Sequence, residues 1–114
     1  MKIKRGFLYL ADLSPRFGSE AGKTRPVLVV QADDLNMAGH TSTWILPCTT
    51  KLVGENILRV SLPQGIASNH KACEIMIDQS RAIDNQRIVD ELGQVPALLM
   101  KEVERKLRLC AGLK

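Results

Sequence analysis

The spacing of apolar residues changes once along the chain, at Pro96. Before this proline, apolar residues gather in short runs that stop at turn-forming residues, a pattern typical of strands. After it, Leu99, Val103, Leu107 and Cys110 recur at intervals of three or four residues and would share one face of a helix. We therefore expect a mainly β (α+β) fold, in which a small antiparallel barrel or curled sheet is covered by one C-terminal amphipathic helix.

The expected strands are short segments in the first two-thirds of the chain. They are Phe7–Leu13, Pro26–Val30, Thr41–Cys48, Ile57–Leu62 and Cys73–Ile77. These segments are rich in β-branched, aromatic or alternating apolar residues, and most of them stop near a proline or a polar turn. Between the second and third lies Asp33–His40, a polar connection with about one helical turn.

The length of 114 residues is enough for one domain, which we expect to span residues 1–114. No stretch approaches the roughly 20 apolar residues of a membrane span, and the basic start of the chain is too soon interrupted for a secretory signal. We therefore expect a cytoplasmic protein without membrane association. Its formal net charge of +4 suits a partner that carries phosphates or an acidic peptide, and is equally common on ordinary basic surfaces.

The cysteines Cys48, Cys73 and Cys110 are odd in number, widely spaced and flanked by apolar residues. This pattern predicts buried, reduced thiols rather than a disulfide framework. The two histidines, His40 and His70, match no zinc-ligand spacing. We expect neither a metal site nor a cofactor.

The segment Gly18–Thr24 invites comparison with a phosphate-binding P-loop. A P-loop has four residues between its glycines, because the backbone must wrap around a phosphate before a helix begins. Here three residues separate Gly18 from Gly22, and the segment leads through Arg25 and Pro26 into a strand. No helix N-terminus would face a phosphate, so nucleoside triphosphate binding is excluded.

Four segments instead carry a family resemblance: Arg5–Pro15 (RGFLYLADLSP), Gly18–Val30 (GSEAGKTRPVLVV), Pro47–Thr50 (PCTT) and Asp78–Asp84 (DQSRAID). In this order, and with the C-terminal helix, they resemble the MazF/PemK (Kid) family of toxin endoribonucleases over nearly the whole chain. The resemblance implies an SH3-like, CcdB/PemK-like barrel with an added helix, assembled as a homodimer. It also implies the toxin of a type II toxin–antitoxin system, inhibited by a cognate acidic, MazE-like antitoxin.

The resemblance further implies a metal-independent, sequence-selective cleavage of single-stranded RNA, the activity of an mRNA interferase. By motif position, Arg25 and Thr49 match the principal catalytic arginine and threonine of the family, and Glu20 matches an acid in the preceding loop. The RNA-binding residues implied in the same way are Thr50, Asp78, Gln79 and Arg81.

The chemistry of such a cleavage is consistent with these residue types. The neighbouring 2′-OH attacks phosphorus, giving a 2′,3′-cyclic phosphate and a 5′-OH end. A guanidinium remains charged and matches phosphate oxygens bidentately, so Arg25 suits stabilisation of the phosphorane and is a poor base. Thr49 would donate its hydroxyl to the phosphate. The residue type alone leaves four acceptors for the 2′-OH proton: Glu20, Asp78, His40 and His70.

Two other functions remain open from the sequence. A non-catalytic, CcdB-like toxin that inhibits DNA gyrase would share the barrel, although the ending Cys110–Lys114 lacks the Trp-Gly-Ile terminus that such toxins carry. A basic RNA-binding module without chemistry would retain RNA and never cut it.

Overall fold

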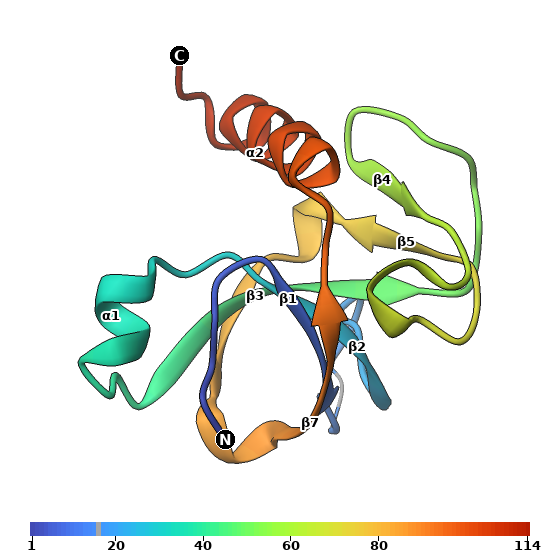
Figure 1. Ribbon diagram of the computed structural model, residues 1–114. Coiled ribbons are helices and arrows are strands. Elements are labelled where there is room, and N and C mark those ends of the chain that lie inside the picture. Colours follow the sequence, from blue (N-terminus) through green and yellow to red (C-terminus); the bar gives the residue numbers. More distant parts are fainter. Residues whose placement is uncertain (16) are drawn as a thin grey trace.

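The computed structural model describes residues 1–15 and 17–114, and within this range seven strands form one antiparallel sheet (Figure 1). The strand order is β4-β5-β3-β2-β1-β7, and β6 pairs with the first half of β3. The strands are β1 (Phe7–Asp12), β2 (Thr24–Val29), β3 (Ser42–Thr49), β4 (Arg59–Leu62), β5 (Cys73–Met76), β6 (Arg81–Asp84) and β7 (Ile88–Gln94).

Two α-helices and three short 3-10 helices complete the described part of the chain. They are α1 (Asp33–Met37), α2 (Ala97–Ala111), η1 (Ile66–Ser68), η2 (Ile77–Gln79) and η3 (Asn85–Arg87). The long helix α2 begins after Pro96 and ends at Gly112, whose φ of +71° is the left-handed conformation that closes many helices and that glycine adopts without a steric penalty. None of these described helices is long and apolar enough to cross a membrane.

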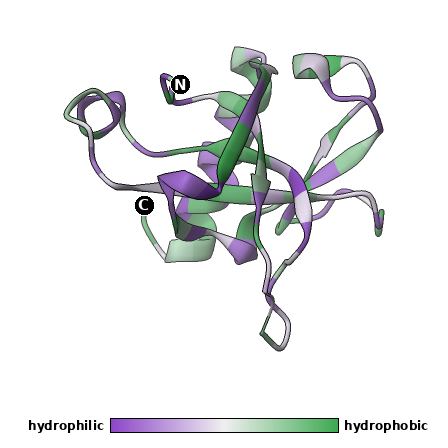
Figure 2. Cartoon of the chain, turned by 90° about the horizontal axis from the view of Figure 1, so that it is seen from below, coloured by the Kyte–Doolittle hydropathy of each residue, from purple (hydrophilic) through white to green (hydrophobic). Residues whose placement is uncertain are grey.

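The sheet has a hydrophobic core on each face, because successive side chains of a strand point to opposite sides. On β2, Leu28 belongs to one cluster while Val27 and Val29 belong to the other. The first cluster lies beneath α2 and includes Val103 from that helix. Figure 2 shows apolar segments along the strands and hydrophilic residues in several connecting loops. A central strand buried on both faces explains why Pro26–Val30 reads as a continuous apolar run.

The expected mainly β architecture with a C-terminal helix is confirmed, but four details differ. The strand β6 was not predicted, because Ile83 is its one buried residue. The strand β7 was not predicted either, because most of its residues are partly or fully exposed and lack an alternating apolar pattern. The strand β4 begins at Arg59 rather than Ile57, because Asn56 closes a turn by accepting hydrogen bonds from Leu58 and Arg59. Cys110 is exposed, so its predicted burial is wrong, whereas Cys48 and Cys73 are buried as expected.

The exposure of Cys110 has a geometric cause. The first three turns of α2 contact the core through Leu99, Val103 and Leu107, and the last turn extends beyond that cluster. There Cys110 faces an apolar groove of about 550 Å³ that is also lined by Trp44. The end of the helical stripe is therefore left without a partner inside the described chain.

Two buried contacts fix the surroundings of the site described below. Lys106 is 4% exposed, and its ammonium donates to the carbonyl oxygen of Arg59 at 2.8 Å, which ties α2 to the start of β4. Gly93 of β7 lies so close to η1 that a Cβ there would be 2.9 Å from the carbonyl carbon of Ala67. These contacts hold β4 and the segment after η1 in place.

Candidate active site

Arg25 is the second residue of β2, and its guanidinium is held by the protein at two points. Its Nε donates to the carbonyl oxygen of Gly22 at 2.7 Å, and its Nη1 donates to the carbonyl oxygen of Cys48 at 3.2 Å. A guanidinium has five N–H donors, so these two bonds orient the group and leave others for a ligand. Pro26 favours the extended backbone at Arg25 that sends the side chain toward β3.

The loop that precedes Arg25 is fastened at its base. The amide of Leu13 donates to the carbonyl oxygen of Lys23 at 2.9 Å, and the amide of Lys23 donates to Ser14 Oγ at 3.1 Å. Lys23 itself has a φ of +66°, a conformation that costs free energy in a residue with a side chain. Ala21 is buried against the second core cluster. The loop thereby places Glu20 and Lys23 next to Arg25.

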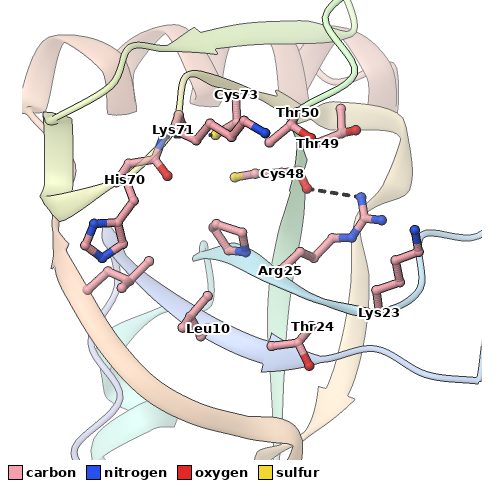
Figure 3. Close-up of a pocket in the computed structure, with 13 residues that line it drawn as sticks. Leu10, Lys23, Thr24, Arg25, Cys48, Thr49, Thr50, His70, Lys71 and Cys73 are labelled. Atoms are coloured by element: carbon pink, nitrogen blue, oxygen red, sulfur yellow. Dashed lines mark hydrogen bonds between the residues drawn. The ribbon is translucent and has the colours of Figure 1, made fainter.

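Thr49 ends β3, one residue after the carbonyl group that binds Arg25. Its Oγ1 accepts a hydrogen bond from the amide of Lys51 at 3.1 Å. That acceptance orients the hydroxyl group and leaves its own hydrogen free to donate. Figure 3 shows the guanidinium of Arg25 directed toward the end of β3, where Thr49 is followed by Thr50.

Two adjoining cavities meet at this pair. The first, of about 330 Å³, extends toward His70 and Lys71, and the second, of about 440 Å³, extends toward Glu20 and Asp78. Both cavities are lined by Lys23, Arg25, Thr49 and Thr50. They therefore form one groove, called here the site groove, with the arginine–threonine pair at its centre.

The structure brings most of the predicted site residues together. The second cavity is lined by Glu20, Arg25, Thr49, Thr50, Asp78 and Gln79. Arg81 lines neither cavity: it lies in β6 opposite Ile45, half-buried, and its Nη1 has no hydrogen-bond partner among the described residues. Of the two histidines, His70 lines the first cavity, whereas His40 lies in the connection between α1 and β3 and lines neither.

The site groove is predominantly basic. Its acidic side chains are Glu20 and Asp78, and its basic ones, histidine aside, are Lys23, Arg25, Lys51, Arg59 and Lys71. Such a surface attracts a polyanion and places cations on both sides of the central pair. Within residues 1–15 and 17–114, no three His, Cys, Asp or Glu side chains come together as a possible metal site.

A buried carboxylate, that of Glu74, is hydrogen-bonded to Arg59, which lines the second cavity. Glu74 is 3% exposed and accepts hydrogen bonds from the amides of Val53 and Gly54 and from Arg59 Nη1, at 3.1, 2.9 and 2.8 Å. Burial acts to raise the pKa of this carboxyl, but the three hydrogen bonds and the charge of Arg59 outweigh it and lower the pKa. Because Glu74 pairs with Thr49 across β3 and β5, it couples the loop after β3 to the site.

Sequence reasoning missed Glu74, Lys23 and Lys71. A signal for Glu74 was present, since it is the one charged residue in the apolar run Cys73–Ile77, and a charge inside such a strand is kept only with partners. Lys23 and Lys71 lie in loops whose course no sequence pattern indicated. Together these groups make an arrangement that can bind a phosphodiester, donate hydrogen bonds to it and accept a proton beside it.

Comparison with known proteins identifies relatives over almost the whole chain. Residues 4–110 match the family described as PemK-like, MazF-like toxin of type II toxin-antitoxin system. Endoribonuclease EndoA of Bacillus subtilis (strain 168) is 33% identical over 119 residues, covering 99% of this chain and 97% of that protein.

Solved structures agree with this match. The crystal structure of MazF (Form-I) from Deinococcus radiodurans superposes with a TM-score of 0.86 at 25% identity, covering 99% of each chain. A MazE-MazF crystal structure (Form-III) from Deinococcus radiodurans gives a TM-score of 0.80 at 24% identity over the full length of both chains. The curled sheet with its C-terminal helix is therefore the fold of these structures.

Proposed function

The chain belongs to the PemK-like, MazF-like toxin family of type II toxin–antitoxin systems, and on this premise we propose that it is a toxin that cleaves single-stranded RNA. The observation that carries the proposal is the placement of Arg25 and Thr49 side by side at the centre of a basic groove. A charged fork and a hydroxyl donor in contact with one phosphate are what the transition state of a phosphodiester transfer requires.

We assign the reaction to an internal transfer in which the 2′-OH attacks the neighbouring phosphorus. Arg25 stabilises the additional negative charge on the non-bridging oxygens, and Thr49 donates a hydrogen bond to the same group. The products are a 2′,3′-cyclic phosphate and a 5′-OH end. The guanidinium supplies the positive charge at phosphorus, so the proposed reaction is independent of a metal ion.

The proton of the 2′-OH needs an acceptor beside the central pair. Glu20 and Asp78 line the second cavity and His70 lines the first, so three of the four candidates from the sequence lie around Arg25. We assign the acceptance to Glu20, which the loop before Arg25 presents, and RNA contacts to Asp78, with Thr50 and Gln79 beside it. The leaving 5′-oxygen then faces the first cavity, where His70 has an N–H donor to offer when it is protonated.

The proposed assembly is a cytoplasmic homodimer of one toxin domain spanning residues 1–114. Its support is the unpartnered apolar groove at the end of α2, where Trp44 is 41% exposed and Leu113 is 62% exposed. Contiguous exposed apolar surface of this kind is typical of an interface. Arg81, which does not reach the site groove, is proposed to contact RNA or the second subunit.

The proposed partners are single-stranded RNA and a cognate acidic, MazE-like antitoxin. Both would present negative charge to the same basic side chains, and an extended acidic tail could order along the groove on binding. A MazE-MazF complex is among the solved structures that share this fold. We propose that antitoxin and RNA compete for the site groove.

The deciding experiment is to incubate purified protein with mixed-sequence single-stranded RNA in EDTA and to map the fragment ends by mass spectrometry. We expect cyclic-phosphate ends at one recurring short sequence. RNA that is retained and never cut would indicate a binding module instead. Cleavage that needs an added metal ion would overturn the proposed mechanism, and inhibition of gyrase without RNA cleavage would favour a CcdB-like toxin.

A further inference from the structure

Two buried thiols lie directly behind the arginine–threonine pair. Cys48 of β3 pairs with Ile75 of β5, and Cys73 is two residues before Ile75, so both cysteines occupy the same face of neighbouring antiparallel strands. They are 1% and 2% exposed, belong to the same core cluster and line the first cavity. Figure 3 shows both side chains beside the cavity.

The surroundings of the two thiols shift their pKa values in opposite directions. The neighbouring Cys48 thiol and a hydrogen bond of 3.4 Å from Asn69 Nδ2 lower the pKa of Cys73 against the opposing effect of burial. The neighbouring Cys73 thiol and burial raise the pKa of Cys48. The pair thus combines a sulfur whose pKa is lowered with a neighbour whose pKa is raised.

We propose that Cys48 and Cys73 form a reversible oxidation site, whose intramolecular disulfide inactivates the adjacent Arg25–Thr49 centre. The effect on activity rests on the proposed RNA cleavage, whereas formation of the disulfide does not. In reducing compartments, disulfides are most often transient and redox-sensing, so a dithiol beside a reactive centre fits such a role.

The oxidant is a hydroperoxide, and the reaction takes place in two steps. The Cys73 thiolate attacks one peroxide oxygen, the O–O bond breaks, and the products are Cys73 sulfenic acid and hydroxide, or an alkoxide from an organic peroxide. Cys48 then attacks the Cys73 sulfur, the S–O bond breaks, and the proton of Cys48 leaves with the hydroxyl group as water. Two thiols lose two electrons in total, and one peroxide gains them.

The bond would disturb the site through the backbone of β3. Diagonal neighbours on antiparallel strands have Cα atoms roughly 7–8 Å apart, whereas disulfides span roughly 4.4–6.8 Å. Closing the bond therefore draws the backbone at Cys48 by about 1 Å, and that backbone carries both the carbonyl oxygen bound by Arg25 and the following residue, Thr49. A misplacement of about 1 Å in a catalytic geometry costs about a hundredfold in rate.

The test uses the full-length Cys110→Ser variant, because the exposed Cys110 could otherwise form disulfides between molecules. Hydrogen peroxide is added and then removed, and the intact mass, the number of free thiols and the rate of RNA cleavage are measured. We expect a loss of two hydrogens, no remaining free thiol, a cleavage rate lower by about a hundredfold and full recovery with dithiothreitol. An unchanged thiol count, or a disulfide-bonded protein that cleaves within about twofold of the reduced rate, would overturn the proposal.

Two further variants on this background separate the roles of the thiols. Cys48→Ser leaves the sulfenic acid of Cys73 unresolved, so the reagent dimedone should label that residue after peroxide treatment. Cys73→Ser should show no label and no change in cleavage rate with peroxide. Labelling of Cys48 instead would overturn the assignment of the attacking sulfur. If the reduced protein cleaves no RNA, the proposed function fails, while mass and thiol count still decide whether the disulfide forms.

Discussion

Arg25 Nη1 donates a hydrogen bond to the carbonyl oxygen of Cys48 at 3.2 Å, so the guanidinium is bound to the residue immediately before Thr49. The start of β2 and the end of β3 are thereby joined at the point where the two cavities meet. Because the carbonyl of Gly22 fixes the other side of the guanidinium, the donor directions are set before any ligand binds. An ordered cation of this kind needs little reorganisation during the reaction.

The first prediction concerns Arg25 itself. Arg25→Lys keeps the charge and loses the planar fork, and Arg25→Ala loses both, so we expect each variant to lower the cleavage rate by about a hundredfold or more. Circular dichroism should show the native fold in both. Arg105→Ala, on the exposed face of α2, is the matched control and should cleave normally. Wild-type cleavage by Arg25→Ala would remove this residue from the mechanism.

The second prediction separates the hydroxyl of Thr49 from its shape. Thr49→Ser keeps a donor beside the Lys51 amide and should retain activity within about tenfold, whereas the isosteric Thr49→Val should lose about a hundredfold. Single-turnover cleavage of one RNA substrate measures both rates. Equal losses in the two variants would mean that packing, and not the hydroxyl, matters at this position.

The third prediction distinguishes the two carboxylates of the second cavity. If Glu20 accepts the 2′-OH proton, Glu20→Gln should lower the rate by about 10² to 10⁴-fold and abolish the fall in rate on the acid side of the pH profile. Asp78→Asn should weaken RNA binding and keep that acid limb. The opposite pattern would assign the role of proton acceptor to Asp78. If neither variant changes the acid side of the pH profile, the remaining candidate beside Arg25 is His70.

The fourth prediction concerns the buried Glu74. Glu74→Gln removes the charge facing Arg59 and leaves one NH₂ group in place of an acceptor, so the free energy of unfolding should fall by about 1–3 kcal/mol. Urea unfolding at neutral pH measures this loss. The control Glu91→Gln, which breaks a surface pair with Lys4, should change stability by less than about 1 kcal/mol.

Glu74 also gives the stability a pH dependence. Its pKa in the folded protein is lowered from 4.5, so its contribution is fully present above pH 4.5 and is lost as the pH falls through the lower, folded-state pKa. We expect acid unfolding of Glu74→Gln to be shallower below pH 4.5 than that of the wild type. Parallel acid-unfolding curves for the two proteins would contradict this linkage.

The fifth prediction tests the shared groove. A peptide corresponding to an acidic antitoxin tail should slow RNA cleavage competitively. Added salt should weaken the binding of both ligands, because RNA binding releases counterions and because salt screens the attraction between opposite charges. Lys71→Ala should weaken the binding of RNA and peptide together, since this residue lines the groove. If a saturating concentration of the acidic peptide leaves the cleavage rate unchanged, the peptide and the RNA do not share a binding site.

Sequence patterns predicted the parts of this molecule that depend on local chemistry. The helical stripe from Leu99 to Leu107 and the apolar run of β2 follow directly from side-chain periodicity. The burial of Cys110 was predicted wrongly, because the spacing of apolar residues indicates which face of a helix is apolar and does not indicate how far along the helix the core extends. Arg25 and Glu20 were identified by a motif, and their shared cavity with Asp78 depends on strand pairing that no local pattern contains.

The buried ionic contacts could not be predicted for the same reason. Lys106 belongs to an exposed-looking helical pattern, and only the position of β4 makes its ammonium a donor to Arg59. Its pair with Glu102 at 3.5 Å is a local i, i+4 contact within α2, which the sequence does indicate. Its contact with Glu55 at 3.9 Å comes from a distant part of the chain and, like the bond to Arg59, is a property of the tertiary arrangement.

The backbone contact between Gly93 and Ala67 limits how this protein can be redesigned. Any side chain at position 93 would displace the stretch that leads into His70 and Lys71, even though Gly93 does not line the site groove. A library built to change which RNA sequence is cut should therefore keep glycine at position 93 and vary the loop around it.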